Sequence, residues 1–69
     1  MVVVDQRVVF DAFDGLKDAV EKLSLMVTGT VYMVNYKHRV FHVVYHVGTK
    51  EMRTSFKFCD IGDKVKVLK

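Results

Sequence analysis

Apolar residues recur at helical spacing in the segment DAFDGLKDAVEKLS, residues 11–24. One side of such a helix would be apolar, and the charged residues would fall on the other side. The apolar stripe consists of Phe13, Leu16, Ala19, Val20 and Leu23. Asp11 suits the N-cap, and Lys22 lies near the last turn, where the helix dipole favours a cation. The pattern predicts one amphipathic helix over residues 11–24.

The preceding segment, VVVDQRVVF, fits two patterns. In a strand, alternate residues would share one face, namely Val2, Val4, Val8 and Phe10. In a helix capped by Asp5, residues Val8, Val9 and Ala12 would instead extend the apolar stripe backwards. The density of valine favours the strand, and the helix stays open as the alternative for residues 1–10.

After Leu25 the hydrophobic period changes from helical spacing to two. The segments VTGTVYMVNYK, RVFHVVYHVG and MRTSFKFC are rich in β-branched and aromatic residues and are separated by short polar turns. Turns at Lys37-His38 and Thr49-Lys50 predict an antiparallel register that places Val34 opposite Phe41. The last segment, IGDKVKVLK, predicts a short strand with Val65 and Val67 directed inward.

The predicted register divides the sheet into two faces. One face collects large apolar side chains and forms a core that the helix would cover. Its members are Tyr32, Val34, Phe41, Val43, Tyr45, Val47, Phe56 and Phe58. We therefore expect a single α+β domain over residues 1–69. Its order is an N-terminal strand, a packed amphipathic helix, and then three or four strands of a mainly antiparallel sheet.

The opposite face of the predicted sheet combines apolar and basic residues. It carries an apolar strip of Val31, Met33, Val40 and Val44, and a rim of His42, His46, Arg53 and Lys57. Exposed apolar patches with polar rims usually mark a contact surface. A homodimer or a half-closed barrel that buries this face is the simplest expectation, and a foreign partner is the other.

Charge along the chain favours nucleic acid as that foreign partner. Residues 1–25 carry three basic and five acidic side chains, whereas residues 26–69 carry eight basic and three acidic ones, which gives net charges of −2 and +5. The basic half would present positive potential to a phosphate backbone. The predicted contact residues are Lys37, Arg39, His42, His46, Arg53 and Lys57. One observation speaks against this prediction, because the register directs most aromatic rings into the core, where they cannot stack on bases.

Three histidines stand four residues apart in KHRVFHVVYHV, at positions 38, 42 and 46. Four residues span about 13 Å in a strand, too far for two histidines to share one ion, so we expect no metal site. The histidines are instead expected to add positive charge at lower pH. Cys59 falls diagonally from His42 in the predicted register, but no other motif of nucleophilic catalysis accompanies this pair. We expect neither an enzyme nor a cofactor.

The remaining features concern location and role. A single cysteine fits a reducing compartment. The N-terminus lacks the pattern of a signal peptide, and no apolar run reaches the length of a membrane span, so we expect a cytoplasmic protein without a membrane partner. The sequence predicts a non-catalytic regulatory binding module that contacts nucleic acid through the basic sheet face. The alternative is an inhibitor, an adaptor or a homodimeric module that uses the same face to bind protein.

Overall fold

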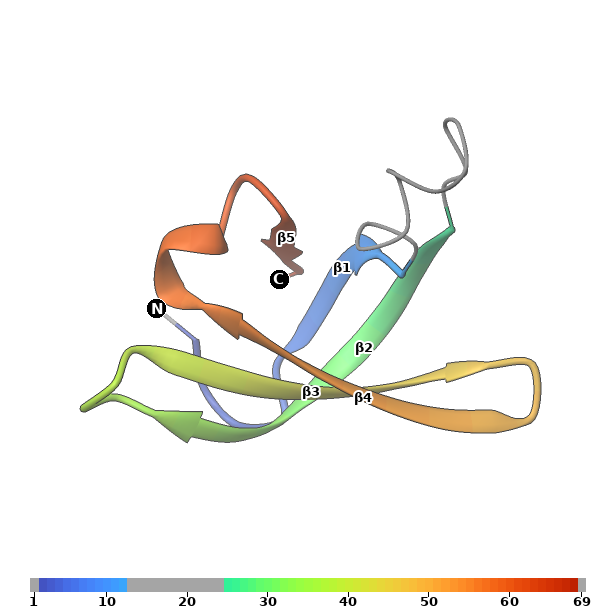
Figure 1. Ribbon diagram of the computed structural model, residues 1–69, viewed down its shortest axis with the longest axis horizontal. Coiled ribbons are helices and arrows are strands. Elements are labelled where there is room, and N and C mark those ends of the chain that lie inside the picture. Colours follow the sequence, from blue (N-terminus) through green and yellow to red (C-terminus); the bar gives the residue numbers. More distant parts are fainter. Residues whose placement is uncertain (1, 13–24, 69) are drawn as a thin grey trace.

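The chain forms one five-stranded sheet in which all neighbouring strands are antiparallel (Figure 1). The computed structural model describes residues 2–12 and 25–68. Its strands are β1 (Arg7–Asp11), β2 (Met26–Asn35), β3 (Val40–Val47), β4 (Lys50–Lys57) and β5 (Val65–Val67), with the 3-10 turn η2 (Phe58–Asp60) after β4. Their order across the sheet is β4-β3-β2-β1-β5.

The predicted α+β class was wrong, because no α-helix packs on the sheet among the described residues. Most of the predicted helix over residues 11–24 lies outside them. Asp11, the expected N-cap, is instead the last residue of β1 and pairs with Met26. Its Oδ1 accepts the backbone N–H of Leu25 at 3.0 Å. The strand alternative for the N-terminus is confirmed only from Arg7 onward, since residues 2–6 precede β1. The antiparallel β2-β3-β4 meander is confirmed as well.

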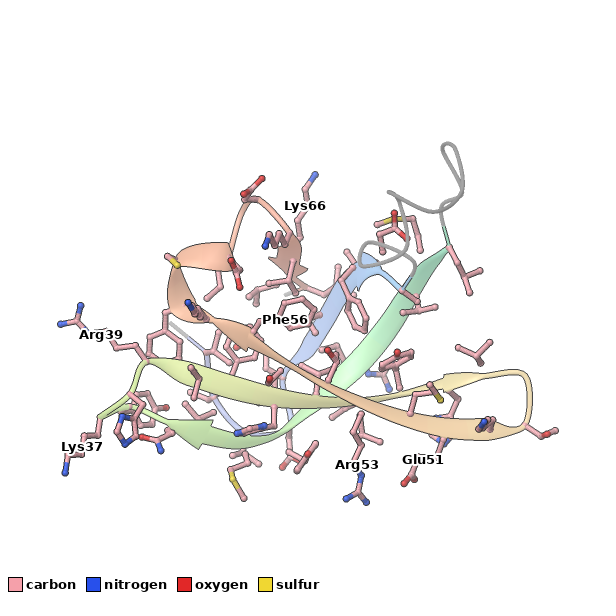
Figure 2. All side chains as sticks on the ribbon, viewed as in Figure 1. Lys37, Arg39, Glu51, Arg53, Phe56 and Lys66 are labelled. Carbon is pink, nitrogen blue, oxygen red and sulfur yellow. The ribbon has the colours of Figure 1, made fainter. Side chains whose placement is uncertain are left out.

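The sheet covers its own core by curling. The ring of Phe10 on β1 lies 5.0 Å from that of Tyr45 on β3 and 5.1 Å from that of Phe56 on β4. In a flat sheet β1 and β4 would be about 14 Å apart, three strand spacings. Figure 1 shows the β3–β4 hairpin crossing the β1–β2 pair at a steep angle, and in Figure 2 Phe56 points into the space between them. The curl therefore covers the core that the described residues form.

The buried core draws on the N-terminal segment and on β1, β2, β3 and β5, and partly buried side chains of β4 pack against it. Its buried members are Val2, Val8, Phe10, Val31, Phe41, Val43, Tyr45 and Val65. The inward directions predicted for Phe41, Val43, Tyr45 and Val65 are confirmed, and Val67 is half-buried beside them. Val4 was predicted on the same face as Val2 but is 51% exposed, because it precedes β1 and the chain turns there.

A β-bulge in β2 changes which side chains point inward. Val34 stands opposite Phe41 as predicted, but Met33 stands opposite His42 and Val31 opposite Val43. Tyr32 is therefore the extra residue of the bulge, and the alternation changes phase there. Val31 is fully buried, whereas Tyr32 and Met33 are both exposed. The predicted inward direction of Tyr32 and outward direction of Val31 were wrong, since they assumed unbroken alternation.

The register of the second hairpin differs from the prediction by two residues. The turn consists of Gly48 and Thr49, one position earlier than expected, and Phe41 stands opposite Phe56 rather than Phe58. Gly48 has a φ of 63°, the left-handed conformation that a tight hairpin turn uses and that glycine adopts without strain. A shift of two residues leaves each β4 side chain on its predicted face but moves it along the strand, and Phe58 enters η2.

Gly29 marks the closest approach of β2 to the core. A Cβ atom there would clash with Cγ1 of Val43 and would lie 3.2 Å from Cε1 of Phe10. Both neighbours are buried, and the branched side chain of Val43 has few alternative rotamers. We expect Gly29→Ala to lower the free energy of unfolding by about 1–3 kcal/mol, measured by urea denaturation.

The matched test of this clash is a double-mutant cycle. Val43→Ala removes the closest atom that the new methyl group would meet and leaves the backbone oxygen of Val44, at 3.0 Å, in place. The Gly29→Ala, Val43→Ala double variant should therefore be less destabilised than the two single changes added together. Strict additivity would show that the methyl group finds room without moving Val43.

Candidate nucleic-acid interface

The convex side of the β2-β3-β4 meander carries the candidate site. We call this the outer face; its residues alternate with those that point into the core. They are Tyr32, Met33, Val40, His42, Val44, His46, Glu51, Arg53 and Ser55. Lys57 continues the alternation at the end of β4. The bulge adds Tyr32 to this face, and the sequence pattern had placed no tyrosine there.

Tyr32 lies at the centre of a small cluster on the outer face. The Cζ atom of Arg53 lies 5.3 Å from the centre of its ring, within the range of a cation–π contact. The ring of His42 lies 6.0 Å away, tilted by 40°. These three side chains, together with Thr54 and Ser55, line a shallow hollow of about 220 Å³. The outer face thus presents an aromatic ring beside a guanidinium group.

Glu51 is an acidic member of the outer face. Its Oε2 accepts a hydrogen bond from Nη2 of Arg53 at 3.3 Å, and its Oε1 lies 4.0 Å from Nε2 of His46. Figure 2 shows the side chains of Glu51 and Arg53 projecting together from the sheet, away from Phe56 and the core. More than half of each side chain in these pairs is exposed. An ion pair in that setting contributes at most about 1 kcal/mol, so an external anion can replace Glu51 as the partner of Arg53.

The six predicted basic contact residues fall into two groups rather than one patch. His42, His46 and Arg53 lie on the outer face. Lys37 and Arg39 lie at the tip of the β2–β3 hairpin, which Figure 2 places at the far end of the molecule from Glu51. Lys57 belongs with this second group, because it lines a hollow there.

The hollow at the hairpin tip holds about 280 Å³. We call it the tip notch; its lining residues are His38, Arg39, Lys57, Phe58 and Cys59. It brings the loop between β2 and β3 beside the end of β4 and the start of η2. The backbone N–H of Phe58 donates to the carbonyl oxygen of Arg39 at 2.9 Å and joins the two segments.

The predicted apolar strip is much reduced. Val31 is buried in the core, so its placement in the strip was wrong, and the bulge is the reason. Val40 and Val44 are half-buried. Met33 alone of the four residues is largely exposed, at 52%. The spacing of three between the inward valines, Val31 and Val34, is the one sequence signal of the bulge, but Tyr32 and Val34 fit ordinary alternation equally well.

The other predicted chemistry is separated in space. His42 and His46 lie on β3, as the strand argument requires, and His38 lies in the preceding turn. Among residues 2–12 and 25–68, no group of three potential ligands could hold a metal ion. The diagonal pairing of Cys59 with His42 was wrong, because the shifted register places Ser55 opposite His42. Cys59 is exposed within η2.

Comparison of the chain with protein-family models, with characterised proteins and with solved structures finds no match. The described part of the chain contains no helix long and apolar enough to cross a bilayer. The side chains of the outer face and of the tip notch are therefore the features that indicate a function.

Proposed function

We propose that this protein is a non-catalytic module that binds single-stranded nucleic acid on its outer face. The observation that carries the proposal is the bulge in β2, which turns Tyr32 outward beside Arg53. In this proposal Tyr32 stacks on a base, and Arg53 contacts a neighbouring phosphate. The bulge also answers the main objection from the sequence, that most aromatic rings belong to the core.

Stacking explains why a single strand is the favoured form. Binders of single strands combine aromatic side chains with a positively charged surface, and one stacked base contributes about 1–3 kcal/mol. Tyr32 is 39% exposed, so part of its ring is accessible to a base. Bases also stack on arginine guanidinium planes, and the Tyr32–Arg53 pair therefore offers two adjacent stacking surfaces. Paired bases inside a duplex would not reach either one.

Electrostatics supports the same partner. Residues 26–69, which contain the whole outer face, carry a net charge of +5. Arg53 can exchange Glu51 for a phosphate, since its present ion pair is exposed. His42 and His46 lie on the same face as Arg53.

A protein target is the alternative, and the geometry weakens it. That alternative, like the predicted homodimer, needed the apolar strip, from which Val31 is now missing. Val40 and Val44 offer only part of their surface. Met33 beside Tyr32 leaves a small apolar area, and stable protein interfaces need about 800 Å² on each partner.

The proposal is tested by fluorescence anisotropy with labelled 12-nucleotide oligo-dT and oligo-U. We expect binding at low salt that weakens steeply as salt rises, because phosphate contacts release counterions. Tyr32→Ala should weaken binding by roughly 5- to 150-fold, the value of one stacked base. Tyr32→Phe, the matched control, keeps the ring and should bind like the parent protein.

Two results would overturn the proposal. One is the absence of binding to either oligonucleotide at low salt. The other is equal affinity of the parent protein and Tyr32→Ala, which would show that the exposed ring takes no part. A difference in affinity between oligo-dT and oligo-U would identify the preferred nucleic acid.

A further inference from the structure

The tip notch is a second concave site, set apart from the Tyr32 cluster. We propose that it binds a small phosphate ester with an aromatic body, such as a nucleoside monophosphate or the phosphorylated end of a strand. This inference does not depend on the proposed function of the outer face. It follows from the basic residues of the notch, from its aromatic wall and from the hydrogen bonds that hold its loop.

Charge in the notch is of one sign. Three of its five lining residues are basic, namely His38, Arg39 and Lys57, and none is acidic. Neither Arg39 nor Lys57 forms an ion pair with another described residue. The nearby carboxylate of Asp60 accepts the backbone N–H of Lys57 through Oδ2 at 2.9 Å, so it caps the chain there. Two cationic side chains at the rim thus lack an anionic partner, and phosphate is the anion that such donors bind well.

The wall of the notch is aromatic and held in place. Phe58 lines it, and the ring of Phe58 packs edge-on against Tyr36 at 5.9 Å and beside Phe41 at 6.1 Å. The hydroxyl of Tyr36 donates to the carbonyl oxygen of Val2 at 2.9 Å and holds that ring in turn. The ring of Phe58 is therefore already fixed in position, and a planar part of a ligand can pack against it.

The loop that forms the other wall is held by its backbone. The N–H of His38 donates to Oδ1 of Asn35 at 3.0 Å. Arg39 has a φ of 58°, a left-handed conformation that disfavours residues with a side chain. Glycine or asparagine would occupy that position with less strain, so an arginine there points to a use for its side chain. Strained residues of this kind cluster at binding sites.

The size of the notch limits the ligand. About 280 Å³ lies just below the range of roughly 300–1,000 Å³ for pockets that take small molecules. The volume suits one nucleotide, whereas a longer strand would extend out of the notch. A free nucleoside monophosphate and the phosphorylated end of a strand share the chemistry that the notch would bind, a terminal phosphate attached to one nucleoside.

The test is a titration of the ¹⁵N-labelled protein followed by amide chemical shifts. The probes are AMP, UMP, adenosine and inorganic phosphate. We expect AMP or UMP to shift the amides of residues 38–39 and 57–59 in a saturable way. Adenosine and inorganic phosphate should each bind at least tenfold more weakly, because each supplies only half of the contacts.

Variants distinguish binding in the notch from general electrostatic attraction to the protein. Arg39→Gln combined with Lys57→Gln should weaken mononucleotide binding at least tenfold. Lys50→Gln, at the opposite end of the β3–β4 hairpin, should leave it unchanged, and the unperturbed spectrum of each variant reports that it is folded. Equal binding of AMP and adenosine, no saturable shift, or shifts at Tyr32 and Arg53 instead of the notch would overturn the inference.

Two oligonucleotides identify the source of the phosphate and keep this inference apart from the proposed function. If a 5′-phosphorylated oligo-dT shifts the notch amides and its unphosphorylated form does not, the natural ligand is a strand end. If AMP shifts the notch amides but neither oligonucleotide does, the natural ligand is a free nucleotide. Failure of the proposed function would appear separately, as the absence of shifts at Tyr32 with the unphosphorylated strand.

Discussion

Val31→Asp is expected to unfold the protein, whereas Tyr32→Asp is expected to leave it folded. Val31 is fully buried within the core. A carboxylate there would be desolvated without a partner, at a cost of several kcal/mol. A domain of this length is stable by about 3–10 kcal/mol in total, so the change removes most or all of its stability. Tyr32 is exposed, and its replacement leaves the core intact.

Circular dichroism and thermal denaturation of the two variants give the measurement. The pair forms its own control, because each variant places the same charge at adjacent positions of one strand. Unbroken alternation along β2 would predict the opposite result, with Tyr32→Asp unfolded and Val31→Asp folded. That outcome would contradict the bulge in β2 and the outward position of Tyr32 that depends on it.

Arg53→Glu is expected to weaken binding of single-stranded oligonucleotides at least tenfold at about 0.1 M salt. The change removes a phosphate contact and the cation that lies over the Tyr32 ring. It also places a second carboxylate beside Glu51, which repels the nucleic acid backbone. A plot of log affinity against log salt concentration should become shallower by a slope of about 1, the value of one lost phosphate contact.

Lys66→Glu is the matched control for this charge reversal. Lys66 is exposed on β5, and Figure 2 shows it on the opposite side of the molecule from Arg53. Both variants change the net charge by the same amount, so general attraction would be lost equally in both. Equal weakening by the two changes would contradict a defined site on the outer face. An unchanged thermal midpoint in each variant excludes unfolding as the cause.

The first hairpin shows how far alternation alone can be trusted. The strand character of residues 40–47 and the inward direction of Phe41, Val43 and Tyr45 were correctly predicted, because the period of two is a local property. The pairing of Val34 with Phe41 was also correct. The prediction failed at Tyr32 and at the residue before it, Val31, because a single extra residue reverses the faces on the far side of the bulge from the turn.

The second hairpin failed for a different reason. Gly48 and Thr49 form the turn, and the prediction placed it one residue later. Moving a two-residue turn by one position shifts the register by two residues. Each β4 side chain therefore keeps its predicted face of the sheet, but its partner on β3 differs from the predicted one. Ser55 stands opposite His42 as a result. Any pairing inferred across β3 and β4, including that of Cys59 with His42, was therefore displaced.

The sequence by itself determined the strands, their antiparallel succession and the basic character of the second half of the chain. These properties depend on the period of two, on turn residues and on composition, which are local. Only the tertiary structure decided that the sheet curls over its own core, that Tyr32 faces outward, and that Lys57 joins Arg39 rather than Arg53. Each of these depends on contacts between residues distant in the chain, such as Phe10 with Phe56, and no local pattern carries that information.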